Sequence, residues 1–127
     1  MSVNRAHVYV CTCCRQGEDA DLRPGAQFLE LLRERLEREG LRDFSVQGVE
    51  CLSVCKRPAT AAFAAAGKWT YVVGDLDAAE HMDDFIVALK AYADSENGVV
   101  PWKDRPPCFK KGVVSRTPPW GFEGAKA

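Results

Sequence analysis

Five of the six cysteines in this 127-residue chain lie in two short stretches. Residues 11–15 read Cys-Thr-Cys-Cys-Arg, and residues 51–58 read Cys-Leu-Ser-Val-Cys-Lys-Arg-Pro. Thiolates are soft ligands that favour zinc, copper(I) and iron–sulfur clusters, and two pairs of them supply a complete tetrahedral set. The two stretches therefore predict a metal or cluster site, provided that the fold brings them together.

The spacing of the cysteines favours one pair from each stretch. A gap of two residues lets one turn of backbone present Cys11 and Cys14 to a common centre, and a gap of three does the same for Cys51 and Cys55. Cys13 projects in a different direction from its neighbour Cys14, so it is the alternative ligand of the first stretch rather than the preferred one. We predict Cys11, Cys14, Cys51 and Cys55 as the four ligands.

Three other residues of ligand type are expected to be bystanders. Cys108 lies in a proline-rich tail with no second cysteine near it in the sequence. His7 falls on a predicted strand and His81 on the polar side of a predicted helix. We expect none of the three to bind metal, and neither histidine to act as a catalytic base.

Composition limits the class of protein and its location. The net charge of −1 gives no general attraction to nucleic acid. No apolar run approaches the roughly 18 to 20 residues that span a bilayer, and the N-terminus lacks the apolar core of a signal peptide. We therefore expect a cytoplasmic protein without membrane or nucleic-acid partners. Because disulfides are rare in a reducing compartment, clustered cysteines there indicate metal binding or redox chemistry.

A helix is predicted between the two cysteine stretches, from about Pro24 to Glu39. Proline suits the first helical turn, and Gly40 just past the end is the expected C-terminal cap. The apolar stripe at helical spacing comprises Phe28, Leu31, Leu32, Leu36 and Leu41.

Strands are predicted at residues 6–11 and 44–49, each directly before a cysteine stretch. Residues 60–66 and 69–74 form a predicted hairpin around Gly67. A second helix is expected from about Ala78 to Asp94, capped by Asp75 or Asp77. Its apolar stripe comprises Met82, Phe85, Ile86, Leu89 and Ala93.

The predicted element order is β-α-β-β-β-α, which is the order of a thioredoxin-like α/β sandwich. A strand–helix–strand unit makes its two strands parallel, so both cysteine stretches leave the same end of the sheet. We assign residues 1–97 to this domain and residues 98–127 to a C-terminal extension packed on it. Five prolines between Pro101 and Pro119 predict that the extension is irregular, an ordered wrap as far as about Pro118.

The second cysteine stretch resembles half of the motif of thioredoxin-like [2Fe-2S] ferredoxins: Cys51-x3-Cys55 after a strand, then a basic residue and Pro58. The whole chain is similar to a family of small bacterial proteins described as predicted metal-binding or ferredoxin-like. The stretches that carry this resemblance are residues 11–15, 24–25, 51–58, 67–76 and 98–102. The resemblance implies Cys11, Cys14, Cys51 and Cys55 as cluster ligands, although those ferredoxins generally have a wider gap between their first two cysteines.

The preferred functional hypothesis is a [2Fe-2S] one-electron carrier that serves a redox partner protein. No constellation of acid, base or nucleophile competes with the cysteines, so we do not expect an enzyme. One alternative is a zinc protein, structural or metal-delivering, that uses the same four sulfurs. Another is a thiol–disulfide oxidoreductase, suggested by the Cys11-x-x-Cys14 spacing, although an acidic loop and Pro24 separate that pair from the helix. A homodimer is an open option for the oligomeric state.

Overall fold

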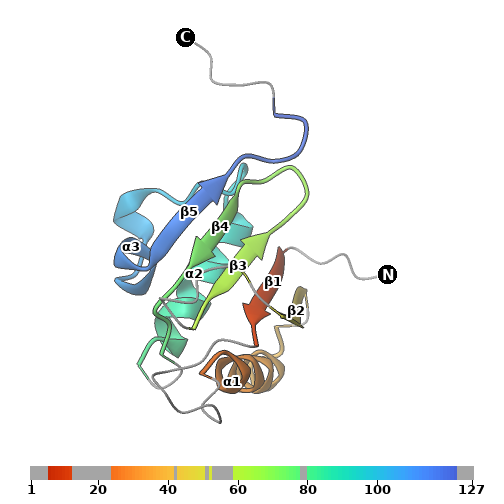
Figure 1. The fold of residues 1–127 in the computed structure, drawn as a ribbon. Helices are drawn as coiled ribbons and strands as arrows, with labels where there is room; N and C mark the ends of the chain where they lie inside the picture. The colour runs from red at the N-terminus through yellow and green to blue at the C-terminus, as the bar shows by residue number, and fades with distance from the viewer. Residues whose placement is uncertain are drawn as a thin grey trace.

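The protein is an α/β fold built on one five-stranded sheet, with strand order β2-β1-β3-β4-β5 (Figure 1). The computed structural model describes residues 6–12, 24–41, 43–50, 52, 59–77 and 80–122. The elements are β1 (Ala6–Cys11), α1 (Pro24–Arg38), β2 (Phe44–Val49), β3 (Ala61–Ala64), β4 (Thr70–Val73), α2 (Met82–Asp94), a 3-10 turn η1 (Trp102–Asp104), α3 (Cys108–Lys111) and β5 (Val113–Thr117).

The pairing of the strands follows from their connections. β1 and β2 are parallel and are joined through α1, whereas β1–β3, β3–β4 and β4–β5 are antiparallel. Gly67 has a φ of 73° in the β3–β4 turn, a left-handed conformation that glycine adopts without strain. The predicted βαβ unit and the hairpin are both confirmed.

The first helix buries a slightly different stripe from the predicted one. Phe28, Leu32 and Leu36 are buried as expected, but Leu29 is buried in place of Leu31, which is 45% exposed. The buried face therefore keeps three of the predicted positions and is rotated toward Leu29. Gly40 has a φ of 70° just past the helix, which confirms the predicted cap.

The second helix begins at Met82, so the predicted start at Ala78 and the predicted cap by Asp75 or Asp77 are wrong. Asp77 instead stabilises a preceding turn: its Oδ1 accepts a hydrogen bond from the Glu80 backbone N–H at 3.0 Å, and its carbonyl accepts one from the His81 N–H at 2.8 Å. The predicted apolar stripe of this helix is buried throughout.

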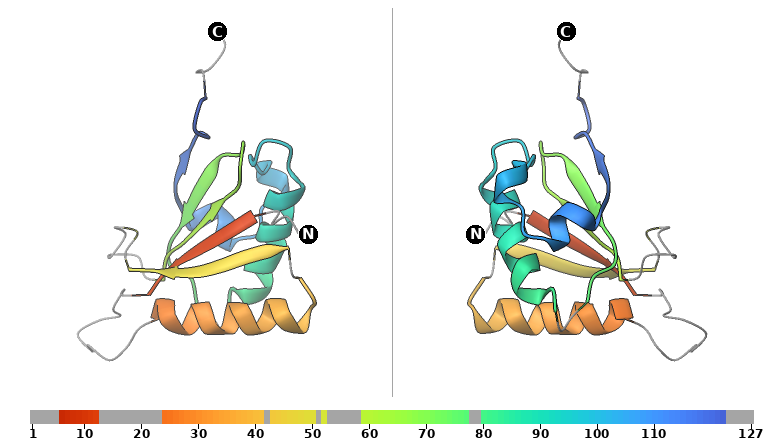
Figure 2. Two further views of the ribbon diagram at one scale, coloured as in Figure 1. Left: turned by 90° about the vertical axis from the view of Figure 1, so that its right-hand side faces the viewer. Right: turned by 90° about the vertical axis from the view of Figure 1, so that its left-hand side faces the viewer.

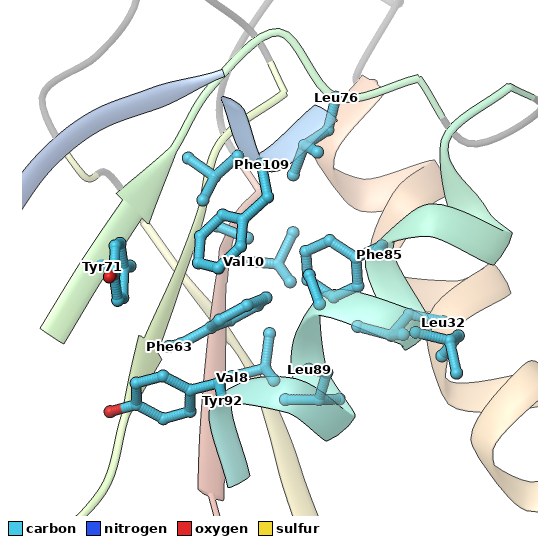
Figure 3. Packing of buried hydrophobic residues seen from close by; sticks show 14 of the residues in the cluster. Val8, Val10, Leu32, Phe63, Tyr71, Leu76, Phe85, Leu89, Tyr92 and Phe109 are labelled. Atoms are coloured by element: carbon cyan, nitrogen blue, oxygen red, sulfur yellow. The ribbon is translucent and has the colours of Figure 1, made fainter. Parts of the chain in front are cut away.

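An aromatic cluster forms the centre of the core (Figure 3). The ring of Phe85 on α2 contacts Phe28 on α1 edge-on, with centroids 4.9 Å apart, and Phe63 on β3 at 5.0 Å. Phe109 on α3 lies 4.7 Å from Tyr71 on β4. Because α1 and α2 meet through these rings, they cover the same face of the sheet; α1 runs alongside β2 in Figure 2.

The C-terminal extension contains more regular structure than the sequence predicted. Val113–Thr117 forms β5, an edge strand that pairs with β4 through an irregularity between Val72 and Val73. The prolines are compatible with this strand because they precede α3 or follow β5 and do not interrupt its ladder. The prediction of an irregular wrap is therefore wrong for residues 108–117.

Arg105 attaches the extension to the sheet. Its Nε donates to the Val100 carbonyl at 2.8 Å, and its Nη2 donates to the hydroxyl of Tyr71 at 3.1 Å. The same hydroxyl accepts a hydrogen bond from the Val100 N–H at 3.2 Å. The Arg105 guanidinium thus links two parts of the extension and also fixes the extension to β4.

Candidate metal centre

The carboxyl ends of β1 and β2 meet at one edge of the sheet. Cys11, the last residue of β1, is the register partner of Val49, the last residue of β2. Cys13 and Cys14 follow β1 within three residues, and Cys51 follows β2 by two. The predicted convergence of the strands that lead into the two cysteine stretches is therefore confirmed.

Cys11 is the one predicted ligand that lies within the described residues. Its side chain is buried, at 1% exposed, and its Sγ donates a weak hydrogen bond to the carbonyl oxygen of Glu50, 3.6 Å away. The backbone N–H of Cys11 donates to the carbonyl of Thr60 at 2.9 Å. The thiol therefore faces the β2 chain at the residue immediately before Cys51.

Thr12 joins the two strand ends just beyond Cys11. Its backbone N–H and its Oγ1 both donate to the carbonyl oxygen of Val49, at 2.8 Å and 3.1 Å. This oxygen lies at the end of the β1–β2 ladder, so the two bonds extend the pairing by one residue. Thr12 carries no signal of this role in the sequence, because a hydroxyl between two cysteines is a common feature.

The start of α1 packs directly on the same point. A Cβ atom on Gly25 would lie 1.7 Å from the carbonyl oxygen of Cys11 and 2.9 Å from its carbonyl carbon. Only a residue without a side chain allows the first turn of α1 to approach the end of β1 this closely. The sequence gives no local signal for this steric role of Gly25, because the carbonyl that it approaches lies 14 positions earlier in the chain.

The remaining predicted ligands lie outside the described residues. These are Cys14, Cys51 and Cys55, together with the alternative Cys13. Within the part of the chain that the structure describes, no group of three or more His, Cys, Asp or Glu side chains could hold a metal ion. Cys11 by itself therefore cannot make a centre, and the ligand set stays a prediction.

Cys108 lies elsewhere in the fold, at the start of α3. It is a free, buried thiol, and its burial together with the negative charge of Asp84 raises its pKa to about 11. It lines a pocket of about 260 Å³ with His81 and Lys111 among its neighbours. The bystander role of Cys108 stays a prediction.

The two histidines also lie apart from Cys11. Nδ1 of His81 accepts a hydrogen bond from the Asp77 N–H at 2.9 Å, in the turn before α2. The ring of His7 stacks on that of Tyr9 with centroids 6.4 Å apart, toward the opposite end of β1. Both side chains have local structural contacts that account for their positions.

The fold is that of the thioredoxin-like ferredoxins. Over 96% of this chain and 99% of the other, it matches a structure described as a thioredoxin-like [2Fe-2S] ferredoxin from Aquifex aeolicus, with a TM-score of 0.59 and 12% identity. A second structure, the wild type of a thioredoxin-like [2Fe-2S] ferredoxin from the same organism at 1.5 Å resolution, matches 91% of this chain and 99% of its own, with a TM-score of 0.55 and 12% identity. At this identity the likeness shows the fold alone.

The chain belongs to the family described as "Protein of unknown function (DUF1636)", whose model matches residues 8–119. No curated protein matches the sequence. The family match covers both cysteine stretches and most of the C-terminal extension. Among the described residues, no helix has the length and apolar character needed to cross a membrane.

Proposed function

We propose that this protein is a one-electron carrier that holds a [2Fe-2S] cluster on Cys11, Cys14, Cys51 and Cys55. The observation that carries the proposal is the register of Cys11 with Val49, because it starts the two cysteine stretches from adjacent points on the sheet. Soft thiolates in two pairs suit such a cluster. The ferredoxin fold of the structural neighbours supports the same assignment.

The described residues around Cys11 are suited to hold one ligand in place. Its backbone N–H is bound to Thr60, and Thr12 and Gly25 fix the adjoining backbone against β2 and α1. When bound, the cluster would accept and release one electron. The chain's own contribution is to fix the first sulfur at the end of a buried strand and to exclude water from it.

A carrier fits these residues better than a thiol–disulfide oxidoreductase. Reactive thiols of that class lie at the start of a helix, where the helix dipole lowers their pKa. Here Cys11 is buried within β1, and α1 begins only at Pro24. We therefore propose a non-catalytic, cytoplasmic electron carrier that serves a redox partner protein, with a homodimer as an open option.

Serine substitutions test the ligand set. Serine at Cys11, Cys14, Cys51 or Cys55 is expected to abolish or shift the visible absorption of the anaerobically purified protein. Cys108→Ser is the matched control, since that thiol is buried in α3 and should leave the spectrum unchanged. If Cys13→Ser bleaches the protein and Cys11→Ser does not, Cys13 replaces Cys11 in the set; if none of the five variants alters the spectrum, the proposal fails.

A further inference from the structure

The two edges of the sheet differ in how they are protected against pairing with another chain. β5 at one edge contains Arg116, pairs irregularly with β4 at Val72 and Val73, and is followed by Pro118 and Pro119. Charged side chains, irregular pairing and prolines of this kind prevent an edge strand from accepting a further strand. β2 at the other edge reads Phe-Ser-Val-Gln-Gly-Val, without a charge or a proline. The sheet can therefore be extended more readily at β2.

The backbone of β2 shows which of its residues face outward. The carbonyl of Val49 accepts two hydrogen bonds from Thr12 at the end of β1, so Val49 faces β1. Because backbone groups alternate in direction along a strand, those of Val46 and Gly48 face away from β1. The hydrogen bond from Nη2 of Arg33 to the Val46 carbonyl, at 3.2 Å, agrees with this direction.

An apolar groove runs beside this edge, between α1 and β2. It has a volume of about 340 Å³, and its apolar lining comprises Leu36, Leu41, Phe44 and Val46. Arg33 and Glu37 also line it, and both are exposed. Figure 2 shows β2 beside α1 at this edge of the sheet. The groove thus combines an apolar floor with one positive and one negative side chain.

α1 runs in the opposite direction to β2, and this direction decides where the two charges lie along the strand. A Cβ atom on Gly48 would meet Leu29 of α1 at 2.9 Å, whereas Arg33 reaches Val46. Four helix residues span about 6 Å, which is roughly the length of two strand residues. Glu37 therefore lies two strand residues further toward the start of β2 than Arg33 does.

We propose that β2 pairs antiparallel with β2 of a second copy of this chain, about a two-fold axis beside Ser45. Since Ser45 lies beside the midpoint between Arg33 and Glu37, the axis sets Arg33 of each copy against Glu37 of the other. α1 packs on both β1 and β2, so the two copies of α1 lie about 10 Å apart, close to the usual distance between packed helices. The inference goes beyond the electron-carrier proposal and does not depend on it.

This pairing leaves the cysteine end of each copy accessible. Val49 lies four residues from the axis, and the two strands run from it in opposite directions. The two cysteine ends are therefore roughly 26 Å apart along the strands. An extended segment of another protein fits the edge less well than a second copy, because only the two-fold axis supplies the opposite charge to both Arg33 and Glu37.

Charge reversal tests the interface directly. Sedimentation velocity of the purified full-length chain over a series of concentrations, with a reductant to prevent disulfides, gives the Kd of the dimer. Arg33→Glu and Glu37→Arg each set like charges against one another twice in the dimer, and we expect each to raise the Kd about tenfold or more. An equal mixture of the two variants should form a heterodimer with a Kd near the wild-type value, because both pairs are then opposite in sign.

Two further variants control for net charge. The double variant Arg33→Glu with Glu37→Arg keeps the net charge of the wild type and should dimerise as the wild type does. Arg38→Glu makes the same charge change as Arg33→Glu at an exposed position of α1 outside the groove, and it should change the Kd by no more than about twofold. Thermal unfolding of each variant checks that it folds.

Three results would overturn the interface: a wild-type chain that stays monomeric at every concentration, a dimer whose Kd the two single variants leave unchanged, or single variants that do not combine with each other. The iron and sulfide content of the protein does not enter this test. A failed dimer therefore leaves the electron-carrier proposal standing, and a chain that lacks a cluster but dimerises as predicted leaves the β2 interface standing.

Discussion

Cys11 and Val49 are direct partners in the parallel pairing of β1 and β2, and the Cys11 thiol reaches the carbonyl of the next residue, Glu50, at 3.6 Å. The ends of β1 and β2, 38 positions apart in the sequence, thus lie side by side. A stretch that contains two or more cysteines begins at or just after each of them. The sheet itself creates the meeting point, and α1 closes over it through Gly25.

Gly25→Ala should disrupt this meeting point. The new Cβ would clash with the backbone carbonyl of Cys11, which cannot rotate away as a side chain could, so α1 must shift. We expect a loss of about 3 kcal/mol or more in the free energy of unfolding, at the upper end of typical overpacking costs. Chemical denaturation followed by circular dichroism measures it, and the visible spectrum should change in parallel.

Gly67→Ala is the control for that substitution. Gly67 lies in the turn between β3 and β4, where a Cβ atom would meet nothing within 4 Å. Because Gly67 has a positive φ, we expect the alanine variant to lose about 1 kcal/mol in the free energy of unfolding and to keep the wild-type visible spectrum. Equal losses in the two variants would contradict the tight approach of α1 to Cys11.

Arg105→Ala should loosen the C-terminal extension. It removes two charge-assisted hydrogen bonds, to Val100 and Tyr71, and we expect a loss of about 2 kcal/mol together with faster amide exchange in β5. Arg105→Lys should recover little of this, since an ammonium cannot reproduce the paired geometry. Hydrogen-exchange mass spectrometry measures the effect, with Lys103→Ala as the exposed control; unchanged exchange in β5 would contradict the anchoring role.

Tyr92 makes the stability of the protein sensitive to pH in the alkaline range. Its buried hydroxyl donates to the Trp69 carbonyl at 2.5 Å, and burial followed by the proximity of Tyr71 raises its pKa to about 12. Because this folded-state pKa lies above the value near 10 of an unfolded tyrosine, the stabilisation is complete below pH 10 and is lost as the pH rises toward 12.

Tyr92→Phe should therefore lower the free energy of unfolding by about 1 kcal/mol at pH 7. Between pH 10 and 12, the free energy of unfolding of this variant should fall less steeply than that of the wild type. Urea denaturation across that range gives both slopes. Cys108, whose pKa is also raised, contributes the same decline to both proteins. A Tyr92→Phe protein that keeps the wild-type slope would show that this hydroxyl does not carry the effect.

Most of the fold could be predicted because it follows from local pattern. The alternation of residues in β1, the stripe of α2 and the glycines at positions 40 and 67 each signal their own structure within a few residues. The parallel pairing of β1 and β2 followed from connectivity, and with it the convergence of the cysteine stretches.

The parts that were missed depend on contacts distant in the sequence. β5 is largely exposed and lies among prolines, so its strand is recognisable only from the free edge of β4 that it joins. Leu29 and Leu31 are equally apolar, and only the packing of α1 on the sheet decides which is buried. Gly25 and Arg105 act through backbone and hydroxyl groups that carry no signal in the sequence near them.

The central claim is that the two cysteine stretches together hold a [2Fe-2S] cluster. Protein purified without oxygen should be analysed for iron, zinc and acid-labile sulfide, together with its visible spectrum. We predict a brown protein with about two iron and two sulfide per chain. A colourless protein with one zinc per chain would contradict the account and assign the same cysteines to a zinc site.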